Sequence, residues 1–201
     1  TNFSMRNIAK PSAWQPLPAG DGQTLNLRAQ TNGRFFQSYS LSFVEPWLGG
    51  HKQNSLSLSV FHSVQTNGKD KFINTDDGKV ANPERQSLLI TGGSVGLGKR
   101  LPWPDDYFLL RQSINYQLYD LRNWTSLFSF SNGQSNVLSY QISISRNSVD
   151  APFFARSGSD VTLSLKATPP YSWFQPGRDW ASEEPATRYQ WAEFHKWKFT
   201  T

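Results

Sequence analysis

The sequence YFLLRQSINYQLYD, from Tyr107 to Asp120, alternates apolar and polar residues, and this pattern decides the fold class. Apart from Gln112, the even positions from 108 to 118 are apolar: Phe108, Leu110, Ile114, Tyr116 and Leu118. The odd positions from 111 to 117 are polar: Arg111, Ser113, Asn115 and Gln117. Because successive side chains of a β-strand point to opposite faces, this spacing predicts a strand with one apolar and one wet face.

The same alternation recurs along the whole chain, and helical periodicity is almost absent. Further strands are expected at 24–31, 35–44, 54–64, 86–100, 137–146, 160–167 and 188–200, with a remnant at 2–8. These segments give roughly eight or nine strands of the length that an outer-membrane barrel needs. We therefore predict an all-β chain that forms an incomplete part of an antiparallel, up-and-down transmembrane β-barrel.

The two faces of these strands differ in a way that favours a membrane. One face carries mainly Ser, Gln, Asn and Thr, which suit a hydrated lumen, whereas the outer face of a soluble β-sandwich is usually more charged. The other face is apolar and is expected to contact lipid. The lipid-facing candidates are Leu56, Leu58, Ile142, Ile144, Leu163 and Leu165.

The connections between the strands are of two alternating kinds. One kind is compact, rich in Pro and Gly, and carries aromatic rings, as in EPWLGG (45–50) and LPWPDD (101–106). The other kind is mostly longer and polar, as expected for the extracellular loops of a barrel with short periplasmic turns. Rings at the compact turns would lie at headgroup depth and form an aromatic girdle. The membrane-interface candidates are Trp14, Trp47, Trp103, Phe153 and Phe154.

The composition narrows the alternatives. Apolar residues make up 37% of the chain and aromatic residues 14%, and there is no cysteine for a disulfide or a thiolate metal site. The net charge of +5 comes from mostly scattered basic residues, which argues against a nucleic-acid partner. A soluble, secreted β-sandwich that binds carbohydrate remains open as an alternative, with Trp124, Trp173 and Trp180 as its platform.

No motif indicates catalysis, a cofactor or a metal site. The segment from Gly93 to Lys99 has P-loop spacing, but Arg100 occupies the position of the magnesium-binding Ser or Thr, and no helix follows. The glycines are better explained as relief from crowding in a curved strand. The three histidines lack ligand spacing, and the acidic pairs fall in connections. We therefore expect a protein that is not an enzyme.

Four stretches together resemble the barrel of the BamA family, outer-membrane protein assembly factors of the bacterial surface antigen group. They are LPAGDGQTLNLRAQTNGRFFQSYSLSFVEPWLGG (17–50), GLGKRLPWPDDYF (96–108), RSGSDVTLSLKATPPYSWF (156–174) and RYQWAEFHKWKF (188–199). The resemblance covers nearly the whole chain in collinear order. EPWLGG, and the RSGS turn before a strand that ends in PPYSWF, are its most specific parts.

The resemblance implies a function and partners. Members of that family have periplasmic POTRA domains and a barrel of about sixteen strands. The barrel accepts nascent outer-membrane proteins at a seam between its first and last strands and inserts them without ATP. Residues 1–201 would belong to a single outer-membrane barrel domain and form its wall opposite the gate, with the POTRA domains and seam strands absent. The implied partners are the lipid bilayer, lipopolysaccharide, nascent outer-membrane proteins and accessory assembly lipoproteins of the BAM complex.

Overall fold

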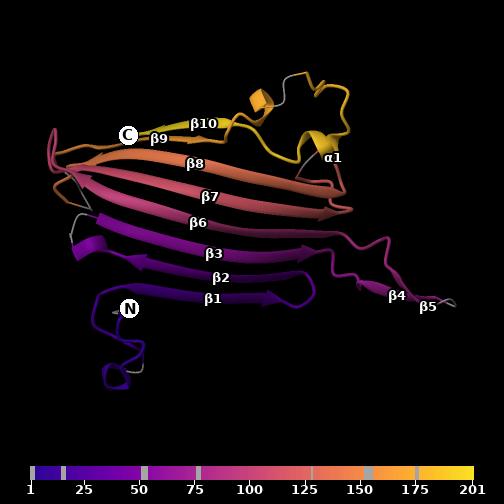
Figure 1. Cartoon of the computed structure of the whole chain (residues 1–201), viewed down its shortest axis with the longest axis horizontal. Coiled ribbons are helices and arrows are strands. Elements are labelled where there is room, and N and C mark those ends of the chain that lie inside the picture. The colour runs from indigo at the N-terminus through magenta and orange to yellow at the C-terminus, as the bar shows by residue number, and fades with distance from the viewer. Residues whose placement is uncertain are drawn as a thin grey trace.

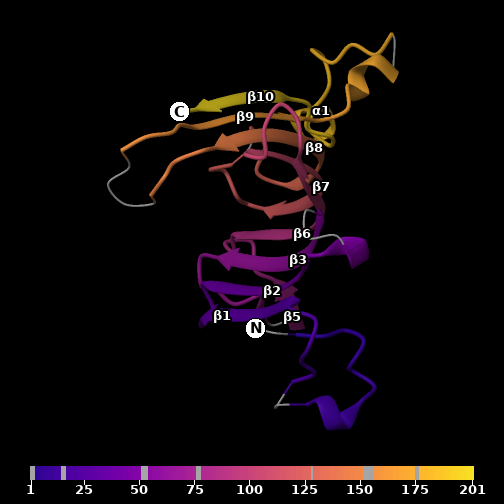
Figure 2. The same cartoon turned by 90° about the vertical axis from the view of Figure 1, so that its left-hand side faces the viewer.

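The computed structural model describes residues 3–14, 17–50, 54–75, 78–127, 129–151, 156–174 and 177–201. Eight of the strands form one sheet in the order β1-β2-β3-β6-β7-β8-β9-β10, and every neighbouring pair is antiparallel. Their bounds are β1 Thr24–Asn32, β2 Phe36–Glu45, β3 Asn54–Thr66, β6 Ser87–Leu101, β7 Phe108–Arg122, β8 Gly133–Asn147, β9 Asp160–Ala167 and β10 His195–Thr200. β1 and β10 lie at opposite margins of the sheet and do not pair with each other (Figures 1 and 2).

The connections lie at the two ends of the strands in the predicted alternation. β4 (Phe72–Thr75) and β5 (Gly78–Ala81) form a separate hairpin, which projects from the same end of the sheet as α1 (Pro185–Arg188) (Figure 1). The compact connections, including η2 (Leu48–Gly50), lie at the opposite end (Figure 1). Two further short helices are η1 (Pro11–Ala13) and η3 (Tyr171–Phe174).

A tight Asn-Gly turn at Asn32–Gly33 joins β1 to β2. Gly33 has a φ of +53°, in the left-handed region that favours glycine, and the amide of Phe35 donates to the carbonyl of Asn32 at 3.1 Å. This tight turn sets the register that places Leu27 opposite Leu41 and Arg28 opposite Ser40. The apolar and polar sets of the two strands therefore fall on separate faces.

Two expected strands are wrong in extent or kind. Of the remnant expected at 2–8, the described residues 3–8 are not a strand: Phe3 makes only isolated bridges with Ala19 and Gln23, and the chain then turns. The strand expected at 188–200 begins only at His195. β9 ends at Ala167, opposite Tyr140 in the middle of β8, so the part of β8 before Tyr140 does not pair with β9. The chain around Trp191 lies along this part instead and forms a bridge with Asn136.

Gly92 is a place where β3, β6 and β7 leave no room for a side chain. A Cβ built there would lie 2.7 Å from the carbonyl oxygen of Tyr116 and 2.8 Å from the ring of Phe61. The sequence-based explanation for Gly96 and Gly98 holds in the same way, since a Cβ at either would meet the hydroxyl of Ser57 or Ser55 at 2.5 Å.

We expect Gly92→Ala to lower the free energy of unfolding by about 1 to 3 kcal/mol, because the ring and the β6–β7 pairing must both shift. Urea unfolding of the detergent-solubilised protein measures the change. Gly96→Ala is the matched control and should cost less, because the Ser57 hydroxyl can rotate away. Equal costs for the two variants would contradict this account of Gly92.

Candidate functional site

The six lipid-facing candidates lie on one face of the sheet. The strand register places Leu58 in line with Val95, Ile142 with Leu165 and Ile144 with Leu163, so their side chains emerge on the same side. Leu58, Ile144 and Leu163 are 37%, 41% and 45% exposed, and Leu56, Ile142 and Leu165 are half-buried. We propose that these six side chains contact lipid, and their position on one face of the sheet supports this proposal.

One row of this apolar face crosses the middle of the strands. Leu58, Val95, Ile114 and Tyr140 stand opposite one another on β3, β6, β7 and β8. Val95 and Ile114 are 50% and 55% exposed. A continuous apolar surface of this kind is unfavourable in water and favourable in the hydrocarbon of a bilayer.

The polar residues that interrupt the apolar rows bond to one another across strands. The Tyr140 hydroxyl donates to Gln112 Oε1 at 2.6 Å, and the Tyr116 hydroxyl donates to Asn136 Oδ1 at 2.7 Å. His62 Nδ1 and Thr91 Oγ1 lie 2.8 Å apart. Each such bond spares a polar group the cost of facing hydrocarbon without a partner. The sequence alone could not reveal these pairs, because they depend on register.

The aromatic candidates that the structure describes lie at the end of the sheet with the compact connections. Trp14, Trp47 and Trp103 are 47%, 51% and 80% exposed. Phe153 and Phe154 lie outside the described residues. Large exposed rings at this end of the strands support the proposed aromatic girdle.

The opposite face of the sheet is polar and contains hydroxyl pairs. Ser59 and Ser94 face each other with their hydroxyl oxygens 2.7 Å apart, and Ser135 and Ser139 on β8 are fully buried. A hollow of about 460 Å³ lies over β6, β7 and β8 on this face, next to Gly96, Ser113 and Asn115. The polar face is therefore suited to line a hydrated lumen.

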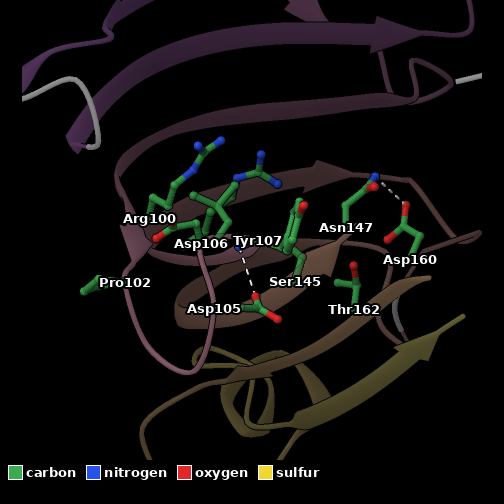
Figure 3. Close-up of a pocket in the computed structure, with 11 residues that line it drawn as sticks. Arg100, Pro102, Asp105, Asp106, Tyr107, Ser145, Asn147, Asp160 and Thr162 are labelled. Atoms are coloured by element: carbon green, nitrogen blue, oxygen red, sulfur yellow. Dashed lines mark hydrogen bonds between the residues drawn. The ribbon is translucent and has the colours of Figure 1, made fainter. Parts of the chain in front are cut away.

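A larger polar hollow of about 790 Å³ opens where β6, β7, β8 and β9 reach their compact connections (Figure 3). Asp105 accepts the amide of Tyr107 at 3.0 Å and forms an ion pair with Arg146 Nε at 2.9 Å. Asn147 donates to Asp160 at 3.1 Å, and Arg100 extends along the opposite wall (Figure 3). A hollow lined by charged and polar side chains suits a water-filled mouth of the lumen.

The turn between β8 and β9 is held by a carboxylate. Asp150 accepts the amides of Arg156 and Ser157 at 3.1 and 3.3 Å. The hydrogen bond from the Ser157 amide, followed by that from Arg156, lowers the pKa of Asp150 below its ordinary value. The carboxylate therefore has a structural role in this turn.

At the other end of the strands, the long connections pack over the polar face. Leu88, Leu121 and Phe130 form a buried cluster there, with Trp124 and Ala186 packed against it. Trp124 thus takes part in packing and not in the exposed platform of the sandwich alternative, while Trp173 is 80% exposed.

The described residues include neither a candidate membrane-spanning helix nor a candidate metal-binding cluster. No helix in that part of the chain is both long and apolar enough to cross a membrane. No group of three or more His, Asp or Glu in the same ranges is placed to hold a metal ion.

Comparison with known proteins gives one positive result. The model of the Omp85 superfamily domain matches residues 19–181, from the segment before β1 to the connection after β9. No curated protein matches the chain.

Proposed function

The chain belongs to the Omp85 superfamily, and from this premise we propose that it is a wall segment of a BamA-like barrel that assembles and inserts β-barrel proteins. Members of the superfamily are integral outer-membrane proteins of assembly and transport and are not enzymes. The predicted all-β membrane fold, outer-membrane location and non-enzymatic character are thereby confirmed. The soluble sandwich alternative is wrong, because these strands form one sheet of an outer-membrane barrel.

The observation that carries the wall proposal is the continuous pairing at the centre of the sheet. Every residue of β6 has a partner on β7, and β7 pairs with β8 from Phe108 to Leu121. An unpaired N–H or C=O group in hydrocarbon costs several kcal/mol, so a fully paired wall resists opening. A seam with few hydrogen bonds, elsewhere in the barrel, would then be the edge that templates an incoming strand.

The proposal extends to the rest of the molecule. β1 and β10 each have only one strand neighbour in the described sheet. The further strands, the seam and the POTRA domains would come from other parts of the full protein. Membership in the superfamily implies contact with the membrane and with substrate proteins. Lipopolysaccharide, nascent outer-membrane proteins and accessory assembly lipoproteins are the partners that we propose.

Insertion into vesicles tests the assembly role. The full-length protein is reconstituted into liposomes, an unfolded outer-membrane barrel protein is added, and its folding is followed by the shift of the folded band in unheated gels. We expect folding to be faster than in empty liposomes. Equal rates in the two preparations would overturn the assembly proposal.

A disulfide across the wall tests the position of the gate. Asn115 and Ser139 are opposite each other on β7 and β8, both on the polar face, at a strand spacing compatible with a disulfide. Because this chain has no other cysteine, Asn115→Cys with Ser139→Cys gives a defined pair here. We expect the oxidised double variant to insert substrate at the rate of the reduced one.

The reduced double variant is the matched control, since it differs only in the bond. Loss of insertion on oxidation, with recovery after a reductant, would place the moving seam at β7–β8 and overturn the wall assignment. Retained insertion supports a wall that stays closed during the reaction.

A further inference from the structure

The connection between β9 and β10 folds into a pocket at the end of the strands with the long connections. Its volume is about 610 Å³, within the roughly 300 to 1,000 Å³ of ligand pockets. Aromatic residues supply much of its wall: Tyr171, Phe174, Trp180, Tyr189 and Trp191. The rings of Tyr171 and Trp191 pack with their centroids 5.0 Å apart at 42°. The connection contains η3 and α1 and lies at the upper right of Figure 1.

The two ends of this connection are bonded to each other, and its second half is bonded to β8. The amide of Thr168 donates to the carbonyl of Phe194 at 3.0 Å, and the amide of Phe194 donates to Thr168 Oγ1 at 2.7 Å. Ser135 donates to the carbonyl of Tyr189 at 2.6 Å, and the amide of Asn136 donates to the carbonyl of Gln190 at 2.7 Å. The pocket is therefore held in shape before any ligand arrives, which lowers the entropic cost of binding.

The charges around the pocket largely balance. Arg178 forms an ion pair with Glu183 at 2.9 Å, and its guanidinium lies 4.7 Å from the centre of the Trp180 ring. The hydrogen bond from Arg178 lowers the pKa of Glu183. Glu193 accepts the amide and the hydroxyl of Ser172 at 3.2 and 3.1 Å. A site with two arginines and two glutamates does not favour an anion over a neutral ligand.

Two buried polar atoms at this pocket have no hydrogen-bond partner among the described residues. They are the hydroxyl of Tyr171 and Nε of Arg188, and both residues line the pocket. Arg188 uses Nη2 to donate to the carbonyl of Ala181 at 2.5 Å, which orients the guanidinium and its buried Nε–H. Buried donors without a partner are rare in folded proteins and call for an acceptor.

We propose that this pocket binds a saccharide unit. Aromatic faces pack against the C–H surface of a sugar ring, and a small shift of the surrounding side chains on binding brings the two buried donors, Tyr171 O–H and Arg188 Nε–H, to oxygens of the sugar. The balanced charge favours such a neutral, polyhydroxylated ligand. The saccharide could be attached to an outer-leaflet lipid or be a free oligosaccharide, and the two share this chemistry.

Saturation-transfer NMR titrations of the full-length protein in detergent test the proposal. The two probes are the neutral outer-core oligosaccharide of lipopolysaccharide, freed of Kdo and phosphate, and maltopentaose. Binding of the core oligosaccharide alone supports a membrane-attached source, and binding of both supports a free saccharide as well. Binding of maltopentaose alone supports only the free source. Absence of binding by both probes would overturn the proposal.

Three variants locate the binding. Tyr171→Phe removes only an unpartnered hydroxyl and should weaken binding about fivefold without harm to folding. Trp180→Ala should weaken it about tenfold. Tyr107→Phe, at the opposite end of the strands, is the matched control and should leave binding unchanged. Equal affinities for all three variants and the parent would show that the saccharide binds elsewhere and would overturn the site. The pocket does not depend on the insertion activity, so either result leaves the assembly proposal standing.

Discussion

Replacing Ile114 by arginine is expected to lower the free energy of unfolding in a bilayer by about 2 to 4 kcal/mol. Ile114 lies near the middle of β7 on the apolar face, between Val95 and Tyr140, and is 55% exposed. A guanidinium at this position would lie near the bilayer midplane, where lipid cannot solvate it. Urea titration of the protein in lipid vesicles measures the loss.

The matched control for Ile114→Arg is Asn115→Arg, one residue along the same strand. Asn115 lines the polar hollow of about 460 Å³, which has room for a longer side chain. We expect this variant to change the free energy of unfolding by less than about 1 kcal/mol. If both variants are equally harmful, the apolar face does not contact lipid, and the assignment of lumen and lipid faces would be wrong.

Strand positions could be predicted from the sequence because the period-two pattern is strong in this chain. The strand expected at 107–120 is β7, Phe108–Arg122, and the strand expected at 160–167 is β9, Asp160–Ala167. In a barrel wall, each face of a strand has the same environment along its length. The polarity of a side chain therefore indicates the face on which it lies. Within β7 the pattern is interrupted at Gln112, whose side chain accepts a hydrogen bond from Tyr140.

The failures fall where local sequence does not specify the partner. The segment 188–194 alternates as a strand would, but β9 is too short to shield the edge of β8, and the chain bonds to Asn136 there instead. The hairpin of β4 and β5 was expected as a polar loop, because its four-residue strands are too short for a periodic signal.

The apolar surface proposed to contact lipid could be predicted from the same alternation of residues, but the loop pocket could not. The common face of Leu56, Leu58, Ile142, Ile144, Leu163 and Leu165 follows from alternation alone. The loop pocket could not be found in this way, because Tyr171, Trp180 and Trp191 meet only after the connection folds back on itself. The available signal was the density of aromatic residues between PPYSWF and RYQWAEF, which has no fixed period.

The isolated 201-residue chain is expected to form large assemblies in buffer without detergent. Its edge strands are open, and they expose apolar side chains: Leu27 on β1 is 77% exposed, and Trp197 and Phe199 on β10 are 63% and 66% exposed. Unpaired edge groups template pairing with another copy, and two open edges allow that pairing to continue. Light scattering coupled to size-exclusion chromatography measures the mass. A monodisperse peak at 22.8 kDa would contradict the expectation.

Charged variants separate edge pairing from association through the apolar face. Leu27→Lys with Phe199→Lys places a charge on each edge, whereas Val95→Lys with Ile114→Lys places two charges in the middle of the apolar face. Lysine on an edge strand blocks strand addition, so the edge variant should slow the growth of scattering more than the central variant. A larger effect of the central variant would mean that the apolar face drives assembly. The open edges of β1 and β10 would then not be the main surfaces through which the copies associate.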